Sequence, residues 1–128
     1  VMKMKKVIAI VSEVQLDNIE AALMQHGVSG FTLHPVRGRG NYCNTYSRDS
    51  LVSHVQIEIY TAAAHASKIA HLIMKVADVG ANSEGLVAIE SLDELYWVHQ
   101  QLPAAEVDFN FIDQDDASAN SEGDENGY

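Results

Sequence analysis

The sequence has few of the residues that form disulfides, cross membranes or bind nucleic acid. Its 128 residues include one cysteine, Cys43, which excludes an intrachain disulfide and a site with two thiol ligands. Apolar runs such as Val7–Val11 fall far short of the ~20 residues that span a bilayer. We therefore expect a cytoplasmic protein that does not insert into membranes.

Positive charge is also scarce. Lys and Arg number 8 against 18 Asp and Glu, a net charge of −10. Eight of the acids and none of the bases fall in residues 104–128, which leaves a net charge of −2 for residues 1–103. Because nucleic-acid binding needs a basic face that displaces counterions, we expect no nucleic-acid partner.

Hydrophobic periodicity predicts six main elements and a short seventh. In chain order they are a strand at Lys5–Ser12, a helix at Gln15–His26 followed by Gly27, a strand at Phe31–Arg37, a strand around Val55–Tyr60, a helix at about Ala62–Ala77, a strand at Leu86–Glu90 and a short helical segment near Leu92–Val98. The order β-α-β-β-α-β is the ferredoxin-like motif, an α+β fold with two helices on one face of an antiparallel sheet.

The first strand, Lys5–Ser12, is apolar on both parities, as in a strand that is covered on both faces. Two helices cover only one face of the sheet. We therefore expect the helix-free face to pack against other copies of the chain.

Residues 1–102 form the predicted domain, and residues 103–128 form an acidic tail rich in Ser, Asn, Asp and Gly. Such a composition predicts disorder after Asp113. Phe109, Phe111 and Ile112 are an alternating apolar patch in this tail, and such a patch can dock on a partner or a neighbouring subunit.

Two segments resemble the PII signal-transduction superfamily, over roughly residues 3–99. The first is KKVIAIV with the later GVSGFTLHPVRGRG, in which Gly38 and Gly40 occupy the base of the family's T-loop. The second is VGANSEGLVAI, Val79–Ile89, at the place of its phosphate-holding B-loop. The resemblance implies a ferredoxin-like homotrimer that binds adenine nucleotides in clefts between subunits.

Gly38-Arg39-Gly40, followed by a short loop that ends at Val52-Ser53-His54, resembles a PII-like branch tied to inorganic carbon. This branch includes the bicarbonate-transporter regulator SbtB and carboxysome-associated PII-like proteins. It implies a non-enzymatic regulator whose loop acts on a membrane transporter or a protein of carbon metabolism, with Arg39 as the coupling residue.

Carried over by position, the resemblance implies a nucleotide site built from both parts of the chain. Thr32 contacts the adenine, Ile10 and Tyr60 line the base pocket, Gly38, Arg39, Gly40 and Asn41 approach the ribose and phosphates, Ser83, Glu84 and Gly85 form the phosphate turn, and His99 takes one arginine position. From the residues alone, a tight helix-to-strand turn with Gly80 as the helix cap is the favoured interpretation of Gly80–Gly85, and the resemblance favours the phosphate turn instead. Glu58, which alternates outward, is as compatible with a solvated face as with a contact.

Cations of the family's site are missing. Leu86 stands at the phosphate-binding lysine, and Trp97 and His99 stand at the two arginines. Each lost charge-assisted contact costs about 1.5–3 kcal/mol. We therefore predict that ADP or AMP, or cyclic AMP, binds more tightly than ATP.

All three arginines, Arg37, Arg39 and Arg48, lie in or beside the loop and are candidate ligands for an oxyanion such as bicarbonate. Ordinary loop solubility is the alternative. The six histidines show no metal-ligand spacing, and no catalytic residue set stands out. A slow nucleotide phosphohydrolase and a metal-responsive structural trimer remain as alternative functions, because fold alone does not choose among them.

Overall fold

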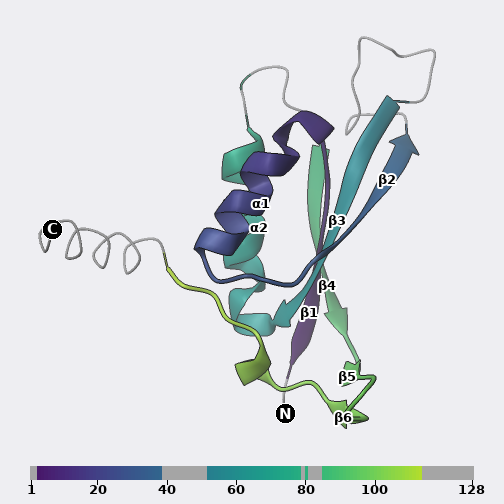
Figure 1. Cartoon of the computed structure of the whole chain (residues 1–128), viewed down its shortest axis with the longest axis vertical. Helices are drawn as coiled ribbons and strands as arrows, with labels where there is room; N and C mark the ends of the chain where they lie inside the picture. Colours follow the sequence, from purple (N-terminus) through teal and green to yellow (C-terminus); the bar gives the residue numbers. More distant parts are fainter. Residues whose placement is uncertain (1–2, 39–51, 79, 81–84, 114–128) are drawn as a thin grey trace, which may run out of the picture.

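The computed structural model of the chain describes residues 3–38, 52–78, 80 and 85–113. Its elements are β1 (Met4–Val11), the 3-10 turn η1 (Glu13–Gln15), α1 (Leu16–Gln25), β2 (Thr32–Gly38), β3 (Val52–Ala62), α2 (Ala63–Ala77), β4 (Gly85–Leu92), β5 (Tyr96–Trp97), β6 (Leu102–Pro103) and the 3-10 turn η3 (Glu106–Asp108) (Figure 1). The predicted order β-α-β-β-α-β is confirmed, with boundaries shifted by one to three residues.

Four strands form one antiparallel sheet in the order β2-β3-β1-β4. β1 is central, and its Val11 pairs with Val55 of β3 and with Gly85 of β4. β2 is an edge strand, which suits Pro35 because proline has no N–H for a second neighbour. The predicted ferredoxin-like α+β fold is therefore confirmed.

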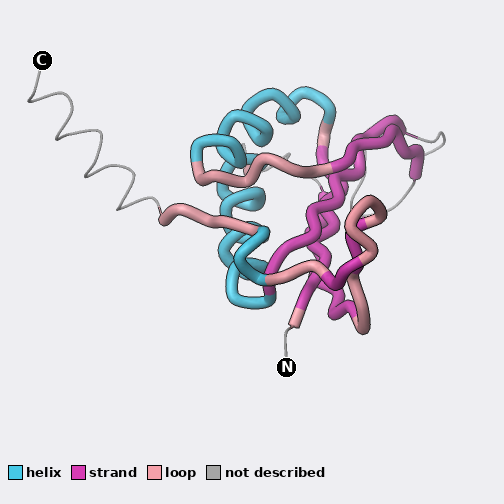
Figure 2. The backbone as a smooth tube through the Cα atoms, turned by 60° about the horizontal axis from the view of Figure 1, so that its bottom comes forward, coloured by secondary structure: helices cyan, strands magenta, loops and turns pink. Residues whose placement is uncertain are grey.

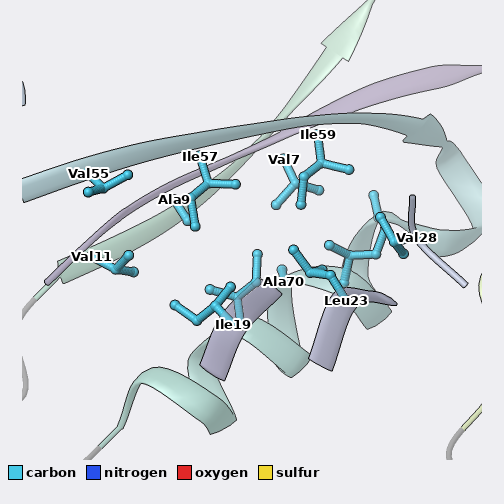
Figure 3. Close-up of a cluster of buried hydrophobic side chains, with 13 residues drawn as sticks. Val7, Ala9, Val11, Ile19, Leu23, Val28, Val55, Ile57, Ile59 and Ala70 are labelled. Carbon is cyan, nitrogen blue, oxygen red and sulfur yellow. The ribbon is translucent and has the colours of Figure 1, made fainter. Parts of the chain in front are cut away.

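Both helices lie on the same face of the sheet, as the tube in Figure 2 shows. Alternate residues of β1 and β3 point to that face: Val7 pairs with Ile59, and Ala9 pairs with Ile57. These side chains meet Ile19 and Leu23 of α1 and the buried stripe of α2 (Figure 3). The period of two in the strands and of 3.6 in the helices thus builds a single apolar core.

Local signals explain the ends of α1. Ser12 Oγ accepts a hydrogen bond from the Val14 N–H at 3.3 Å and starts the preceding turn. At the other end, His26 is the C-cap, and Gly27 follows at φ 84°. Glycine is favoured there because a left-handed conformation carries no side-chain penalty.

The predicted helical segment near Leu92–Val98 is wrong. β4 continues to Leu92, and the chain then forms the short hairpin of β5 and β6, in which Tyr96 pairs with Pro103. The Gln101 N–H donates to the Trp97 carbonyl at 2.9 Å, and Gln101 has φ 57°. The apolar spacing in this segment comes from strand residues and turn residues, which periodicity alone does not separate from one helical turn.

The helix-free face of the sheet carries both apolar and charged residues. Ile8 and Ile10 of β1 are half-buried, and Leu86 of β4 is 39% exposed. Beside them, Glu58 accepts a hydrogen bond from Gln56 at 2.8 Å and lies 3.8 Å from the Lys6 ammonium. Glu58 therefore contacts other side chains of its own chain as well as solvent. Packing of this face against other copies stays a prediction.

Residues 104–113, here named the C-terminal strap, cross the ends of both helices (Figure 1). The Ile112 N–H donates to the His26 carbonyl at 2.7 Å, and His26 Nδ1 lies 2.6 Å from the Ile112 carbonyl oxygen. Phe111 stacks on His26 with ring centroids 5.0 Å apart, and the Asp113 carboxylate lies 3.2 Å from Lys68. The apolar patch of the tail thus packs on its own chain.

Neither described helix is long and apolar enough to cross a bilayer. The predicted disorder after Asp113 concerns residues 114–128, which lie outside the described residues, and the boundary between residues 102 and 103 stays a prediction.

Gly27→Ala tests the α1 terminus. An added Cβ would lie 3.3 Å from Ile112 Cδ1 on a backbone at φ +84°. We expect the free energy of unfolding to fall by about 1–2 kcal/mol, the cost of a left-handed non-glycine residue. Chemical denaturation at fixed protein concentration measures this loss.

Gly30→Ala is the matched control, because nothing lies within 4 Å of the added Cβ. Its unfolding free energy should stay within about 0.5 kcal/mol of the parent value. Equal losses in the two variants would contradict this account of Gly27.

Candidate functional site

The connection from α2 to β4 is bounded by two glycines with positive φ. Gly80 has φ 119° and its N–H donates to Asp78 Oδ1 at 3.2 Å, whereas Gly85 has φ 140°. A Cβ on Gly85 would lie 2.4 Å from the Ile10 carbonyl oxygen. Only glycine permits this approach of β4 to β1. The predicted contacts Ser83 and Glu84 lie outside the described residues.

A cavity of about 330 Å³ lies beside Gly85, between α2 and the start of β4. Its one charged lining residue among those described is Asp78. The lining is otherwise apolar or glycine and consists of Val11, Ile73, Met74, Ala77, Gly85, Leu86 and Val87. The predicted contact Ile10 does not line it, although its backbone touches the Gly85 position.

The loop that joins β2 to β3 leaves the same end of the sheet. Gly38 pairs with Val52, so the two strands end level with each other (Figure 1). Arg37 is exposed and pairs with Ser53. The other residues predicted in this loop, Arg39, Gly40, Asn41 and Arg48, lie outside the described residues.

A second cavity, of about 150 Å³, lies at the opposite end of the sheet. Tyr60 of β3 lines this cavity, whereas Thr32 and His99 do not, and the predicted role of Tyr60 in a base pocket stays a prediction. The remaining walls come from β3, the loop after α1, β5 and the C-terminal strap: Thr61, Gly27, Val28, Ser29, Gly30, Trp97, Asp108, Phe109 and Asn110.

Trp97 and the strap are held together by hydrogen bonds at this cavity. The Trp97 indole N–H donates to Asp108 Oδ2 at 2.8 Å, and the Ala105 N–H donates to the same oxygen at 2.9 Å. The backbone bond first, and the indole bond second, lower the pKa of Asp108 below its ordinary 3.8 because both favour the carboxylate. Trp97 also stacks on Phe109, with centroids 5.8 Å apart.

The predicted contacts divide into two groups that one protomer keeps apart. Ile10, Gly38 and Gly85 lie toward one end of the sheet, and Thr32 and Tyr60 toward the other. From strand spacings of about 4.8 Å and rises of about 3.3 Å per residue, Thr32 and Gly85 are roughly 17 Å apart on opposite edge strands. By the same measure Gly38 of β2 and Gly85 of β4 are also roughly 17 Å apart, so the width of the sheet separates Gly85 from both residues of β2.

Three aromatic and acidic residues of the second cavity were missed as contacts. Trp97 was identified only as a replaced arginine, Asp108 only as one acid of the tail, and Phe109 only as part of a docking patch. The signal available in the sequence was an aromatic pair, Phe109 and Phe111, in an otherwise acidic segment. Nothing in it indicated that the segment returns to Tyr60.

The described residues contain no group of three or more His, Cys, Asp or Glu side chains placed to hold a metal ion.

Comparisons with known proteins agree with the fold. The family model described as "Nitrogen regulatory protein P-II" matches residues 4–101. "Nitrogen regulatory protein P-II 2" of Methanothermobacter thermautotrophicus is 29% identical over 99 residues, covering 72% of this chain and 86% of that protein. "Nitrogen regulatory protein P-II" of Pyropia yezoensis is 28% identical over 100 residues, covering 72% and 88%. Among solved structures, Arabidopsis thaliana PII bound to citrate is similar, with a TM-score of 0.68, 24% identity and coverage of 80% of this chain and 89% of that one.

The Asp108 carboxylate predicts an acid transition at Trp97. Because the folded pKa is lowered, the stabilisation is complete above the ordinary value of 3.8 and is lost as the pH falls through the lower folded pKa. We expect the emission of Trp97, the one tryptophan in the sequence, to change in this range while far-UV circular dichroism stays constant.

Asp108→Asn should remove this transition, whereas Asp93→Asn, at an exposed position, should preserve it. An unchanged acid transition in Asp108→Asn would assign the effect to another group.

Proposed function

This chain belongs to the nitrogen regulatory protein P-II family, and we propose that it is a PII-like regulator that binds adenine nucleotides between subunits. In this proposal it is a cytoplasmic homotrimer, the assembly typical of the family, and not an enzyme. Nucleotide occupancy changes the loop at residues 38–54, and this loop regulates a partner in bicarbonate transport or carbon metabolism.

The observation that carries the proposal is the pair of positive-φ glycines, Gly80 and Gly85. A turn bounded in this way can direct several main-chain N–H groups toward one anion, and oriented backbone dipoles bind phosphate without side-chain charge. The segment between them is the one that resembles the phosphate-holding B-loop of the family.

The distance between the two groups of contacts supports a cleft between subunits. In this proposal Gly85 holds the phosphate side in one protomer, and Thr32 and Tyr60 hold the base side in the next. Thr32 and Gly85 lie on opposite edge strands of one protomer, which favours a site shared between two chains. Half-buried Ile8 and Ile10 on the helix-free face give the copies an apolar surface to share.

The proposed number of phosphates on the bound nucleotide rests on the basic side chains of the family's site that this chain lacks. Leu86, next to Gly85, is 39% exposed and occupies the lysine position, and Trp97 and His99 occupy the arginine positions. A triphosphate depends most on such contacts. The proposed ligands are therefore ADP and AMP, with cyclic AMP as a further candidate, in preference to ATP.

Coupling to a partner passes through the loop between β2 and β3. A ligand shifts a conformational equilibrium only if it interacts differently with the two states. Arg39, between two glycines, is the proposed coupling residue, and Arg37, Arg39 and Arg48 are the candidate ligands of a bound oxyanion. Bicarbonate is the proposed oxyanion, and the proposed partner is a membrane transporter or a carbon-metabolism protein.

Calorimetry with ADP and ATP tests the ligand. We expect ADP to bind at least as tightly as ATP in the parent chain. Leu86→Lys should improve ATP binding relative to ADP by about tenfold, because one charge-assisted contact is worth about 1.5 kcal/mol or more. Leu86→Gln, which adds no charge, is the matched control.

ATP that binds tenfold more tightly than ADP to the parent chain would contradict the ligand preference. Failure of every adenylate to raise the thermal unfolding temperature would contradict nucleotide binding itself, because a ligand of the folded state stabilises it.

Bicarbonate should change nucleotide affinity if it binds beside the phosphates. The expected result is a shift of at least threefold in the ADP dissociation constant between matched bicarbonate and chloride buffers, and loss of that shift in Arg48→Gln. An ADP affinity that is indifferent to bicarbonate would end this part of the proposal.

A further inference from the structure

The cavity beside Tyr60 is too small for a whole nucleotide. Its volume is about 150 Å³, against ~300 Å³ or more for the pocket of a complete small-molecule ligand. Three of its lining residues, Tyr60, Trp97 and Phe109, are aromatic. The size and the walls suit a flat heteroaromatic fragment whose remainder extends out of the cavity.

Trp97 is fixed in this wall rather than free to rotate. Its indole N–H is bonded to Asp108 at 2.8 Å, and its ring is nearly parallel to Phe109, at 16°. The side chain nevertheless stays 40% exposed. A restrained aromatic ring with exposed surface loses little conformational entropy when a second ring stacks on it.

Charge at this cavity opposes phosphate. None of the described residues that line it is basic, and Asp108 is acidic. A phosphate group therefore gains no electrostatic attraction from the lining residues when it enters the cavity. An uncharged aromatic base meets no electrostatic repulsion there. The orientation that follows is base inward and phosphates outward.

We propose that Trp97 is a specificity-determining residue that stacks on the adenine base, and that base stacking rather than phosphate charge carries most of the affinity. This inference rests on the proposed function and deepens it. It extends the ligand class to adenosine itself, which has no phosphate.

Contacts between the C-terminal strap and the two helices position the aromatic wall of this cavity. Phe111 packs between His26 and His65, with centroid distances of 5.0 and 6.3 Å, and two short contacts link Ile112 to His26. Phe109 lies two residues before Phe111 and stacks on Trp97. Phe111 is therefore a positioning residue, and its loss should act on the base through Trp97.

The fluorescence of Trp97 can report ligand binding directly, because the sequence contains one tryptophan. Titration of the full-length chain with adenosine, AMP, ADP and ribose 5-phosphate should quench or shift the emission for the three ligands that carry a base. Ribose 5-phosphate should leave it unchanged. Raising the salt from 50 to 500 mM should change the AMP affinity by less than about threefold, because few ion contacts are lost.

Trp97→Ala should weaken AMP about tenfold, the usual scale for one base–aromatic stack, and should reduce the preference for AMP over ribose 5-phosphate. Trp97→Phe keeps a ring and should stay within about threefold of the parent. Phe111→Ala should lower the AMP preference less than Trp97→Ala does. Val98→Ala is the matched control, because Val98 is 91% exposed and lines neither cavity.

Calorimetric binding of AMP with no change in Trp97 emission, or with full affinity in Trp97→Ala, would overturn this inference and leave the proposed function standing. Absence of calorimetric binding for every adenylate would overturn both. If Trp97→Ala does not fold, the parent emission and Trp97→Phe decide: unchanged emission in the parent overturns the inference.

Discussion

The central strand β1 is the constraint on which the rest of the structure depends. It bonds to β3 along one edge and to β4 along the other, in registers that extend over its full length from Met4 to Val11. Its alternate side chains form the middle of the apolar core, and its Ile10 carbonyl lies where only glycine fits at residue 85. A slip of one residue in the pairing of β1 would turn its core-facing side chains toward the helix-free face.

That register also determines how a ligand site can be assembled. β2 and β4 are the two edges of the sheet, so Thr32 and Gly85 are held apart within one protomer. On the helix-free face, half-buried isoleucines lie beside the ion cluster of Lys6, Glu58 and Glu90. Ion pairs near a protein surface contribute about 0–1 kcal/mol each, so this cluster adds little to the stability of one chain.

The C-terminal strap gives the chain a feature that the βαββαβ core does not need. Hydrogen bonds at His26 and stacking of Phe111 fasten it across the helix ends, and Asp108 then holds the indole of Trp97. An aromatic wall thus stands at a position where the family resemblance implies an arginine. At this corner Trp97 stacks on Phe109, and the hydrogen bond to Asp108 restrains its indole ring.

Sequence alone determined the core elements, because alternation in β3, helical spacing in α2 and Gly27 after α1 are local patterns with local causes. It also identified the glycines at residues 80 and 85 and the lack of a basic side chain at Leu86. Only the tertiary structure decided that residues 92–103 form a strand end and a hairpin, that Phe109 returns to Trp97 and that Thr32 and Gly85 lie on opposite edges. These are contacts between residues distant in the chain, and no periodicity within a short segment encodes which distant partner a side chain meets.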